Sequence, residues 1–343
     1  MTEHEKWMEL ACQEAEKAFG QTHPNPLVGA IAVEKGEIIS AGYHHRAGEA
    51  HAEVNCLKDD LDFSKSTLYV TLEPCSTHGR TPPCTEKVIG SKVQKVVIGN
   101  LDPNPDHAGR AVKILEEAGI EVIHSVLQER CWNLNLPFYK WIQTNKPFVH
   151  LKMAMTLDGK IATKEGQSKW ITGPEAREQV QLMRKECDAI MVGGETIRQD
   201  DSSLRVTLEK WDQPQRYIWS SKSDFSEKLK ALKNDDGKSA IITKPQTTSE
   251  WNSLLTDMGK SEITCLLLEG GGELASNALQ AGIVDKVSFF IAPKILGGRD
   301  SRTPVGGFSP SSLNEALELQ NVLYSTYGKD LLIRGFLSEI WKS

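Results

Sequence analysis

Three residues of metal-binding type stand at the expected ends of secondary-structure elements, and they constrain how the first half of the chain can fold. His51 opens one helical pattern, Cys84 opens another, and Cys75 follows the strand-like run 67–72. Zinc binds His nitrogen and Cys thiolate readily, and three protein ligands leave a fourth position for water. The sequence therefore predicts an open, catalytic type of zinc site that joins two helix starts and one strand end.

Glu53 lies two residues after His51, also at an expected helix start. From there its carboxylate can lean over the metal and move a proton between bound water and substrate. The metal would lower the pKa of that water, and the helix N-terminus would favour Cys84 as a thiolate. His-x-Glu with two later cysteines is typical of zinc-dependent deaminases, although here eight residues instead of two separate Cys75 and Cys84. The alternative is a polar helix start beside two structural thiols.

Strand and helix signals alternate along the chain, which implies mixed α/β sheets covered on both faces. The length of 343 residues suggests two domains, and the polar turn 145–147, which ends in proline, favours domains at 1–145 and 146–343. Residues 220–259 are largely polar and give no clear elements. The predicted elements are helix 5–19, strands 28–33 and 38–43, a helix from His51, strand 67–72, a helix from Cys84, strand 95–99, helix 109–118, strand 121–126, helix 131–141, strand 148–155, helix 174–187, strands 189–192 and 263–268, helix 273–281 and strand 286–292.

Charge and composition exclude several classes of protein. The net charge is -6 and the pI about 5.9, whereas a protein that wraps a nucleic-acid backbone carries the opposite bias. The chain has no apolar run of about 18 residues that would span a membrane, and its acidic start is unlike a secretory signal. Its seven cysteines are therefore interpreted as reduced thiols. We expect a cytoplasmic protein that acts on a small molecule and binds neither nucleic acid nor membrane.

Longer motifs stand in both halves of the chain. They are Cys-Ser-Thr-His-Gly-Arg-Thr-Pro-Pro-Cys at 75–84, Thr-His-Pro-Asn-Pro-Leu-Val-Gly at 22–29, Asp-Pro-Asn-Pro at 102–105, Leu-Lys-Met-Ala-Met-Thr-Leu-Asp-Gly-Lys at 151–160 and Glu-Gly-Gly at 269–271. Together they resemble the bifunctional deaminase/reductases of riboflavin biosynthesis over nearly the whole chain. The resemblance implies an N-terminal cytidine-deaminase-like α/β/α sandwich, a C-terminal dihydrofolate-reductase-like α/β domain, and homo-oligomers formed through the reductase domain.

For the first domain, the resemblance implies a zinc-dependent pyrimidine deaminase. His51, Cys75 and Cys84 would bind Zn²⁺, and Glu53 would be the catalytic proton shuttle. The reaction is hydrolytic deamination of a diaminopyrimidinone ribosyl phosphate, in which hydroxide attacks the carbon that carries the exocyclic amine and ammonia leaves.

Three further residues of this domain are implied in substrate binding. Asn25 resembles the amide that reads the pyrimidine edge, a role that suits a group with both a donor and an acceptor, and its alternative is a turn residue between two prolines. His44 and Arg80 would contact the ribose phosphate, which an Arg can bind through two hydrogen bonds. For His44 the alternative is a solvated surface position.

For the second domain, the resemblance implies reduction of the ribosyl group to ribityl by NADPH. A glycine-rich turn at 270–272 precedes a helix, and such a turn lets backbone approach a phosphate, although alone it is also common in proteins without a dinucleotide. The implied cofactor residues are Ala154, Trp170, Thr196, Asp200, Ser220, Gly271, Gly272, Glu273, Leu274, Ala275, Ser276 and Asn277. The implied substrate residues are Lys152, Ser168, Arg184, Leu204, Arg205 and Glu269.

Alternatives remain for individual residues and for the whole chain. Trp170 is equally consistent with a core position, and Lys152 with a partly exposed strand position. The family has Asp-Asp-Pro before a Leu and an Arg three residues later, whereas this chain has Ser202 and an earlier Arg205. A nucleoside or tRNA deaminase with an accessory domain is a second hypothesis, and a non-catalytic zinc-stabilised assembly protein is a third. The third would not need Glu53.

Overall fold

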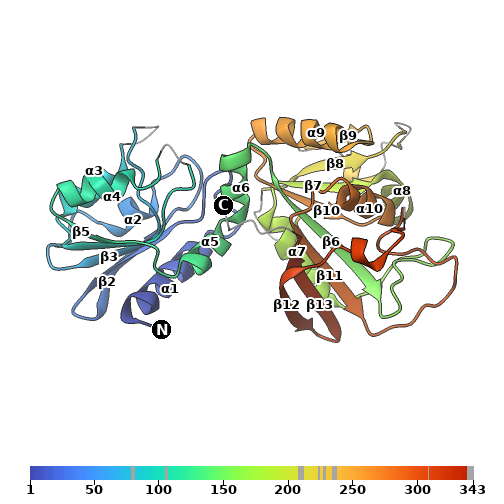
Figure 1. Ribbon diagram of the computed structural model, residues 1–343, viewed down its shortest axis with the longest axis horizontal. Helices are drawn as coiled ribbons and strands as arrows, with labels where there is room; N and C mark the ends of the chain where they lie inside the picture. The colour runs from blue at the N-terminus through green and yellow to red at the C-terminus, as the bar shows by residue number, and fades with distance from the viewer. Residues whose placement is uncertain are drawn as a thin grey trace. The chain divides into compact units, whose positions relative to one another are not determined.

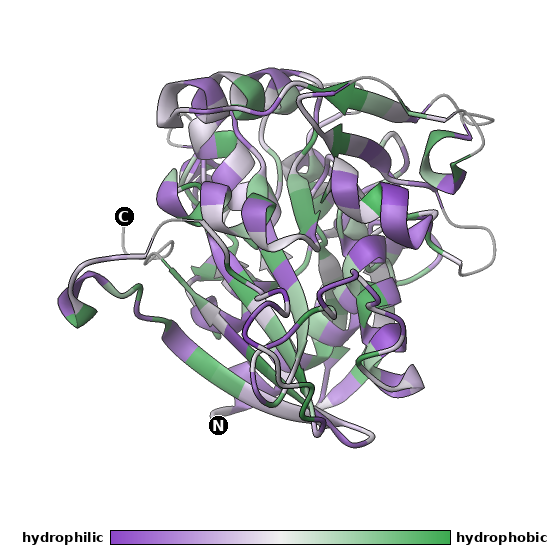
Figure 2. Ribbon diagram, turned by 90° about the vertical axis from the view of Figure 1, so that its right-hand side faces the viewer, coloured by the Kyte–Doolittle hydropathy of each residue, from purple (hydrophilic) through white to green (hydrophobic). Residues whose placement is uncertain are grey.

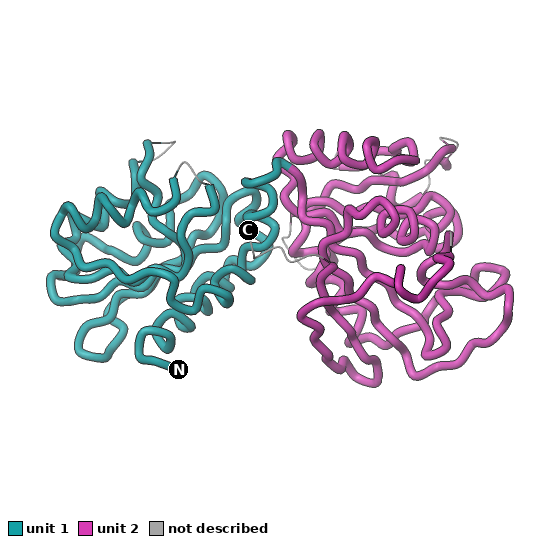
Figure 3. Tube along the Cα trace, viewed as in Figure 1, with its two compact units in different colours: residues 1–145 teal, residues 146–343 magenta. Residues whose placement is uncertain are grey.

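A computed structural model of the chain describes residues 1–78, 82–104, 107–207, 212–222, 225–226, 229–233, 238–307 and 309–337. The chain divides into two compact units, Met1–Asn145 and Lys146–Ser343 (Figure 3). Each unit has its own β-sheet with helices packed against it (Figure 1). Among the described residues, no helix is both long enough and apolar enough to cross a membrane.

The sheet of the first unit has five strands in the order β2-β1-β3-β4-β5. Their bounds are β1 Gly29–Glu34, β2 Glu37–Tyr43, β3 Thr67–Leu72, β4 Lys95–Asn100 and β5 Glu121–Ile123. Strand β1 is antiparallel to both β2 and β3, whereas β3, β4 and β5 are parallel. Lys35 and Gly36, both at positive φ, form the tight turn between β1 and β2, where such backbone is typical of two-residue hairpins.

Side chains of this sheet alternate between two cores, because successive strand residues point to opposite faces. Ile31, Tyr69 and Val97 pack with the core of helices α1 Glu3–Glu16 and α5 Gln128–Leu134. Ala32, Leu68 and Val96, their sequence neighbours on the same strands, pack with the opposite core. That core includes helices α2 Ala52–Cys56, α3 Cys84–Ser91 and α4 Arg110–Glu117. The predicted α/β/α sandwich is confirmed.

The sheet of the second unit has eight strands in the order β12-β13-β11-β6-β10-β7-β8-β9. Strands β11 to β9 in that order are parallel, and β13 and β12 add an antiparallel edge. The bounds are β6 Phe148–Thr156, β7 Ala189–Gly193, β8 Gln215–Trp219, β9 Ser239–Ile242, β10 Cys265–Glu269, β11 Lys286–Ala292, β12 Gln320–Tyr327 and β13 Asp330–Phe336. In Figure 2, hydrophobic residues follow many of the strands, and the helices carry both kinds of residue.

The helices of the second unit are α7 Pro174–Glu186, α8 Gly194–Asp200, α9 Thr248–Lys260 and α10 Gly272–Gln280. Short 3-10 turns cover Lys230–Leu232 and Leu313–Glu315. Trp251 of α9 and Leu274 of α10 pack against Leu151, Leu266 and Leu268 of the central strands. This parallel α/β arrangement places several strand ends at the same edge of the sheet.

The structure differs from the predicted elements in several places, and it adds helix α8 and strands β8, β12 and β13, which were not predicted. The single helix predicted over 131–141 is two helices, α5 and α6 Leu136–Thr144, because Asn135 between them bonds through its amide to the backbone of Leu27. The helix after His51 has only five residues. No elements were predicted in the polar stretch 220–259, where the structure has strand β9 and most of helix α9.

Candidate functional site

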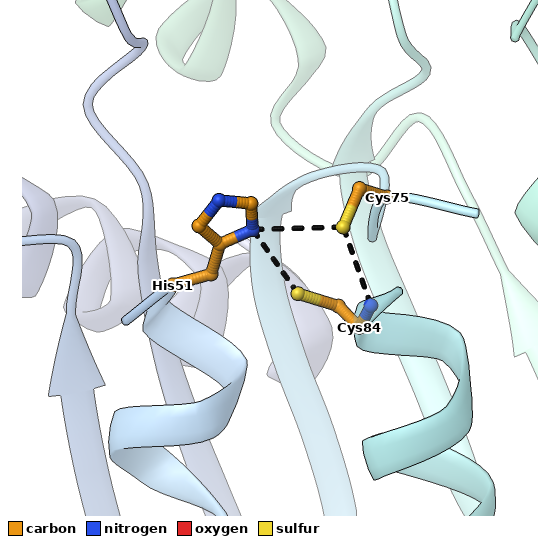
Figure 4. Close-up of side chains that lie close together, drawn as sticks. All are labelled: His51, Cys75 and Cys84. Carbon is orange, nitrogen blue, oxygen red and sulfur yellow. Dashed lines mark hydrogen bonds between the residues drawn. The ribbon is translucent and has the colours of Figure 1, made fainter. Parts of the chain in front are cut away.

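The three predicted metal ligands of the first unit lie together at the same end of its sheet (Figure 4). His51 is the N-cap of α2, Cys84 is the first residue of α3, and Cys75 lies three residues after β3. The Nδ1 atom of His51 is 3.2 Å from Sγ of Cys84 and 3.6 Å from Sγ of Cys75. Their ligand atoms all lie within 4.8 Å of one another, which is close enough to coordinate one ion.

The two thiols of this cluster are hydrogen-bonded to each other, which shifts their pKa values in opposite directions. Hydrogen bonds from Cys84 and from His51 lower the pKa of Cys75 to about 4, whereas the pKa of the Cys84 thiol is raised. The bond to Cys75 also raises the pKa of His51. The sequence predicted that the start of helix α3 would favour Cys84 as the thiolate. The start of α3 also acts on the other sulfur, because the amide N–H of Cys84 donates to Sγ of Cys75 at 3.2 Å. A thiolate at Cys84 in the zinc-bound site stays a prediction.

Glu53 is the second residue of α2 and is only 3% exposed. Burial raises the pKa of its carboxyl group to about 7, and that group lies beside the Cys84 thiol. A buried carboxyl with a pKa near neutrality can both accept and donate a proton, as a general acid–base group must. The side chain is therefore placed next to the metal ligands without being one of them.

Asn25 and His44 form a hydrogen-bonded pair in the same unit, with 3.0 Å between Nδ2 and Nε2. His44 is 2% exposed, and desolvation lowers its pKa, so the ring is neutral at pH 7. Its Nδ1 donates to the carbonyl of Ala50 at 3.1 Å, which leaves Nε2 to accept from Asn25. Both ring nitrogens of His44 thus have protein partners, and the hydrogen bond to Nε2 orients the Asn25 side-chain amide. Arg80, the other residue implied in phosphate binding, lies outside the described residues.

Glu73 is a residue of this site that sequence reasoning did not single out. Its buried carboxylate accepts hydrogen bonds from the backbone amides of Asp102, Gly109 and Ala111. It therefore ties the loop after β4 to the segment that carries Cys75. A small cavity of about 30 Å³ lies between these two segments. The sequence signal that could have identified Glu73 is the position of an acidic residue between an apolar strand and Pro74-Cys75.

The second unit has a cleft of about 1410 Å³ at the carboxyl ends of its parallel strands. Most of the residues implied in cofactor and substrate binding line it: Lys152, Ala154, Ser168, Trp170, Arg184, Thr196, Asp200, Leu204, Ser220, Glu269, Gly271, Gly272, Glu273 and Leu274. Four of the implied residues do not line it. Ala275 and Ser276 are buried, Asn277 accepts from Nε1 of Trp251, and Arg205 donates to the carbonyl of Lys233.

Three charged side chains that line this cleft, Lys152, Arg184 and Glu269, come from neighbouring elements. Arg184 donates two hydrogen bonds to Glu269, at 2.6 and 2.9 Å, and the two side chains are only 12% and 9% exposed. Lys152 of β6 pairs in register with Glu269 of β10. Burial lowers the pKa of Lys152, whereas the charge and hydrogen bonds of Arg184 overcome burial and lower the pKa of Glu269. Glu269 is therefore a carboxylate held between two cations.

The glycine-rich turn lies between β10 and α10 and faces the same cleft. Gly270 and Gly271 have φ of +66° and +85°, and Gly271 is the N-cap of α10. A Cβ on Gly271 would lie 3.2 Å from Oγ1 of Thr196, so the turn leaves little room for a side chain. Backbone amides at a helix start favour anions. Over its whole lining, the cleft has ten Lys or Arg and seven Asp or Glu, an excess of positive charge in a chain of net charge -6.

Comparisons with known proteins agree with this division. Residues 1–100 match the cytidine and deoxycytidylate deaminase zinc-binding region, and residues 147–333 match the RibD C-terminal domain. Riboflavin biosynthesis protein RibD of Actinobacillus pleuropneumoniae is 40% identical, with 95% of this chain and 93% of that protein covered. The RibD of Escherichia coli K12 is 37% identical, with 85% and 88% covered.

Solved structures give the same result. Acinetobacter baumannii RibD has a TM-score of 0.88 at 33% identity and covers 97% of this chain and 98% of its own. A Thermotoga maritima protein described as a diaminohydroxyphosphoribosylaminopyrimidine deaminase/5-amino-6-(5-phosphoribosylamino)uracil reductase has a TM-score of 0.85 at 34% identity, with 96% and 97% covered.

Fold, site and comparisons together define a two-domain enzyme with a deaminase unit of the cytidine-deaminase type and a reductase unit. The resemblance inferred from the sequence motifs is confirmed. The chain belongs to the RibD family of riboflavin biosynthesis proteins, and it is a bifunctional deaminase and reductase of that pathway.

Proposed function

We propose that the first unit deaminates a diaminopyrimidinone ribosyl phosphate with zinc and that the second unit reduces its ribosyl group to ribityl with NADPH. The observation that carries the proposal is the cluster of His51, Cys75 and Cys84 with the buried carboxyl of Glu53 beside it. The description of the Thermotoga maritima relative, which names both reactions, supports the substrate class. The domains proposed for the two steps are 1–145 and 146–343.

The donor set of the first unit fits zinc, because one imidazole nitrogen and two sulfurs are ligands that zinc prefers. Zinc, when bound there, supplies a Lewis acid that lowers the pKa of a coordinated water. In this proposal Glu53 holds and moves the proton between that water and the pyrimidine. Asn25, oriented by His44, presents its amide to the pyrimidine edge. Arg80 remains a prediction for the phosphate.

The cleft of the second unit fits a dinucleotide, because it is large, carries excess positive charge and includes the glycine-rich start of α10. NADPH, when bound there, supplies the hydride that reduces the sugar carbon. Lys152 lies at the inner end of the cleft beside Glu269. In this proposal its Nζ donates a proton to the sugar oxygen as that oxygen gains negative charge. The enzyme otherwise holds donor and acceptor in contact.

The proposal is tested by incubating the enzyme with the phosphorylated diaminopyrimidinone, with and without NADPH, while ammonia and NADPH absorbance are followed separately. We expect ammonia release without NADPH, and NADPH oxidation in step with the deaminated product. Ammonia release from cytidine or tRNA, with none from the phosphorylated substrate, would favour the second hypothesis and contradict this one.

Replacement of Cys75 by Ser is expected to abolish deamination and to leave reduction of supplied deaminated substrate within about twofold of the unmodified enzyme. The reason is that Cys75 is a ligand in the first unit, whereas the cleft residues all lie in the second. Both activities and the zinc content are measured on the folded variant. Cys56→Ser is the matched control, because the Cys56 thiol donates to the carbonyl of Ser40 and a hydroxyl can do the same. Loss of both activities in a folded Cys75 variant would contradict separate sites.

Two further properties are proposed with the function. All seven cysteines are free thiols, which supports a reducing compartment such as the cytoplasm. Homo-oligomers through the reductase unit are supported by the edge strand β12, on which Leu323 and Tyr324 are exposed. Analytical ultracentrifugation of the unmodified chain and of Leu323→Glu measures this second property.

A further inference from the structure

The cleft of the second unit extends past the glycine-rich turn to the ends of strands β8 and β9. Trp219 is the last residue of β8, Lys222 follows it, and Lys244 lies two residues after β9. All three line the cleft. None of the motifs recognised in the sequence includes Lys244, and its position is defined only when β9 pairs with β8.

Lys244 is held over the indole ring of Trp219, with its Nζ 4.1 Å from the ring centroid. Trp219 is only 4% exposed, so it gives the lysine side chain a fixed support. An ammonium group over an aromatic face is favourable, and it keeps its N–H donors available at the other side. Within the part of the chain that the structure describes, neither Lys222 nor Lys244 has a carboxylate within ion-pair distance. Lys230, another cation of the cleft, is paired with Asp201 at 3.2 Å.

The order of the strands shows which part of a dinucleotide reaches Lys244. Lys152 and Glu269, at the reacting end, lie on the adjacent strands β6 and β10, and the glycine-rich turn follows β10. Strand β9 is three positions further along the sheet, at β10-β7-β8-β9. Neighbouring strands are about 4.8 Å apart, so the end of β9 lies about 14 Å from the end of β10. With its nicotinamide at β6 and its pyrophosphate at α10, an extended dinucleotide places its adenosine half toward β8 and β9.

We propose that Lys244, supported by Trp219, binds the 2′-phosphate of the dinucleotide and makes the reductase unit prefer NADPH to NADH. The inference rests on the proposed function, since it requires a dinucleotide in this cleft. The 2′-phosphate is the only chemical difference between the two cofactors, so a cation that meets it sets specificity without changing the hydride transfer. Lys222, a second cation at this end, adds to the same positive field.

The test measures equilibrium binding by calorimetry, with 2′,5′-ADP and 5′-AMP as probes and NADPH and NADH as the full ligands. For Lys244→Gln we expect affinity for 2′,5′-ADP and NADPH to fall about tenfold to a hundredfold, the range for one charge-assisted hydrogen bond. Affinity for 5′-AMP and NADH is expected to change less than twofold. Lys244→Arg keeps the charge and is expected to restore most of the preference. Lys230→Gln, in which a paired lysine of the same cleft is replaced, is the matched control.

Every other outcome contradicts either the role of Lys244 or the proposed function. An equal loss for 2′,5′-ADP and 5′-AMP would show that Lys244 acts on the shared adenosine and would overturn the inference. A loss for ribose 5-phosphate, with 2′,5′-ADP unaffected, would place the phosphate of the pyrimidine substrate there instead. If the unmodified chain prefers NADPH and Lys244→Gln keeps that preference, the inference fails and the proposed function stands. If the unmodified chain binds neither dinucleotide, the proposed function itself fails.

Discussion

Replacement of Glu53 by Gln is expected to reduce deamination by about 10²–10⁴-fold, the usual contribution of a positioned general acid–base group. The amide has almost the shape of the carboxyl group but cannot take up or release the proton. Because the side chain is buried beside the metal ligands and is not one of them, the variant is expected to keep its zinc. Ammonia release and zinc content per chain are measured on the same preparation.

Glu86→Gln is the matched control for this experiment. Glu86 lies on α3, two residues after Cys84, and its side chain is exposed, so the control makes the same carboxyl-to-amide change near the site. It is expected to leave deamination within about twofold of the unmodified enzyme. Deamination retained in Glu53→Gln would remove the proton-transfer role. Zinc lost from Glu53→Gln, with none lost from Glu86→Gln, would make Glu53 a support of the metal cluster instead.

Replacement of Arg184 by Met is expected to destabilise the second unit by about 3–5 kcal/mol, as removal of one partner from a buried ion pair does. Glu269 would remain a buried carboxyl group without its two hydrogen bonds, and its pKa would rise because Arg184 lowers it. The reductase activity is also expected to be lost, since Glu269 lines the cleft. Amide hydrogen exchange of peptides from β10, followed by mass spectrometry, measures the stability of this unit by itself.

Two further variants test whether the loss of stability in Arg184→Met comes from the unpaired charge of Glu269. Arg177→Met removes the same charge from the same helix. Its guanidinium lies over the Trp170 ring and, among the described residues, is not in an ion pair with a carboxylate, so a smaller effect is expected. The double variant Arg184→Met with Glu269→Gln removes both charges, and it is expected to regain most of the stability without regaining reduction. If Arg184→Met and the double variant are equally destabilised, packing and not charge explains the loss.

The metal cluster was predictable because its signals are local. His51, Cys75 and Cys84 are recognisable in the sequence by their residue types, and a helix is predicted to start at two of them. The structure has helix starts at the same two residues. The direction of a single N–H is not visible in the sequence. The amide N–H of Cys84 points at Sγ of Cys75, so the start of α3 also acts on the second thiol.

The reductase cleft was predictable only in part, because its residues come from strand ends that are distant in sequence. Helix α9 was not predicted because it lies largely within the polar run 220–259. Its buried face is formed by Trp251, Leu255 and Met258, which stand at helical spacing among mostly polar neighbours. Asn277, implied as a cofactor residue, instead accepts a hydrogen bond from that buried tryptophan. Lys244 lies beside Trp219 because strand β9 pairs with strand β8. Tertiary packing decided each of these positions.

The hydrogen bonds between Asn135 and the backbone of Leu27 have a consequence for the order in which the protein matures on the ribosome. Leu27 lies two residues after Asn25, so the segment proposed to read the pyrimidine is anchored by a residue more than a hundred positions later. Domains fold largely as units during synthesis, from the N-terminus onward. The segment around Asn25 therefore cannot be anchored before Asn135 has been synthesised, near the end of the deaminase unit.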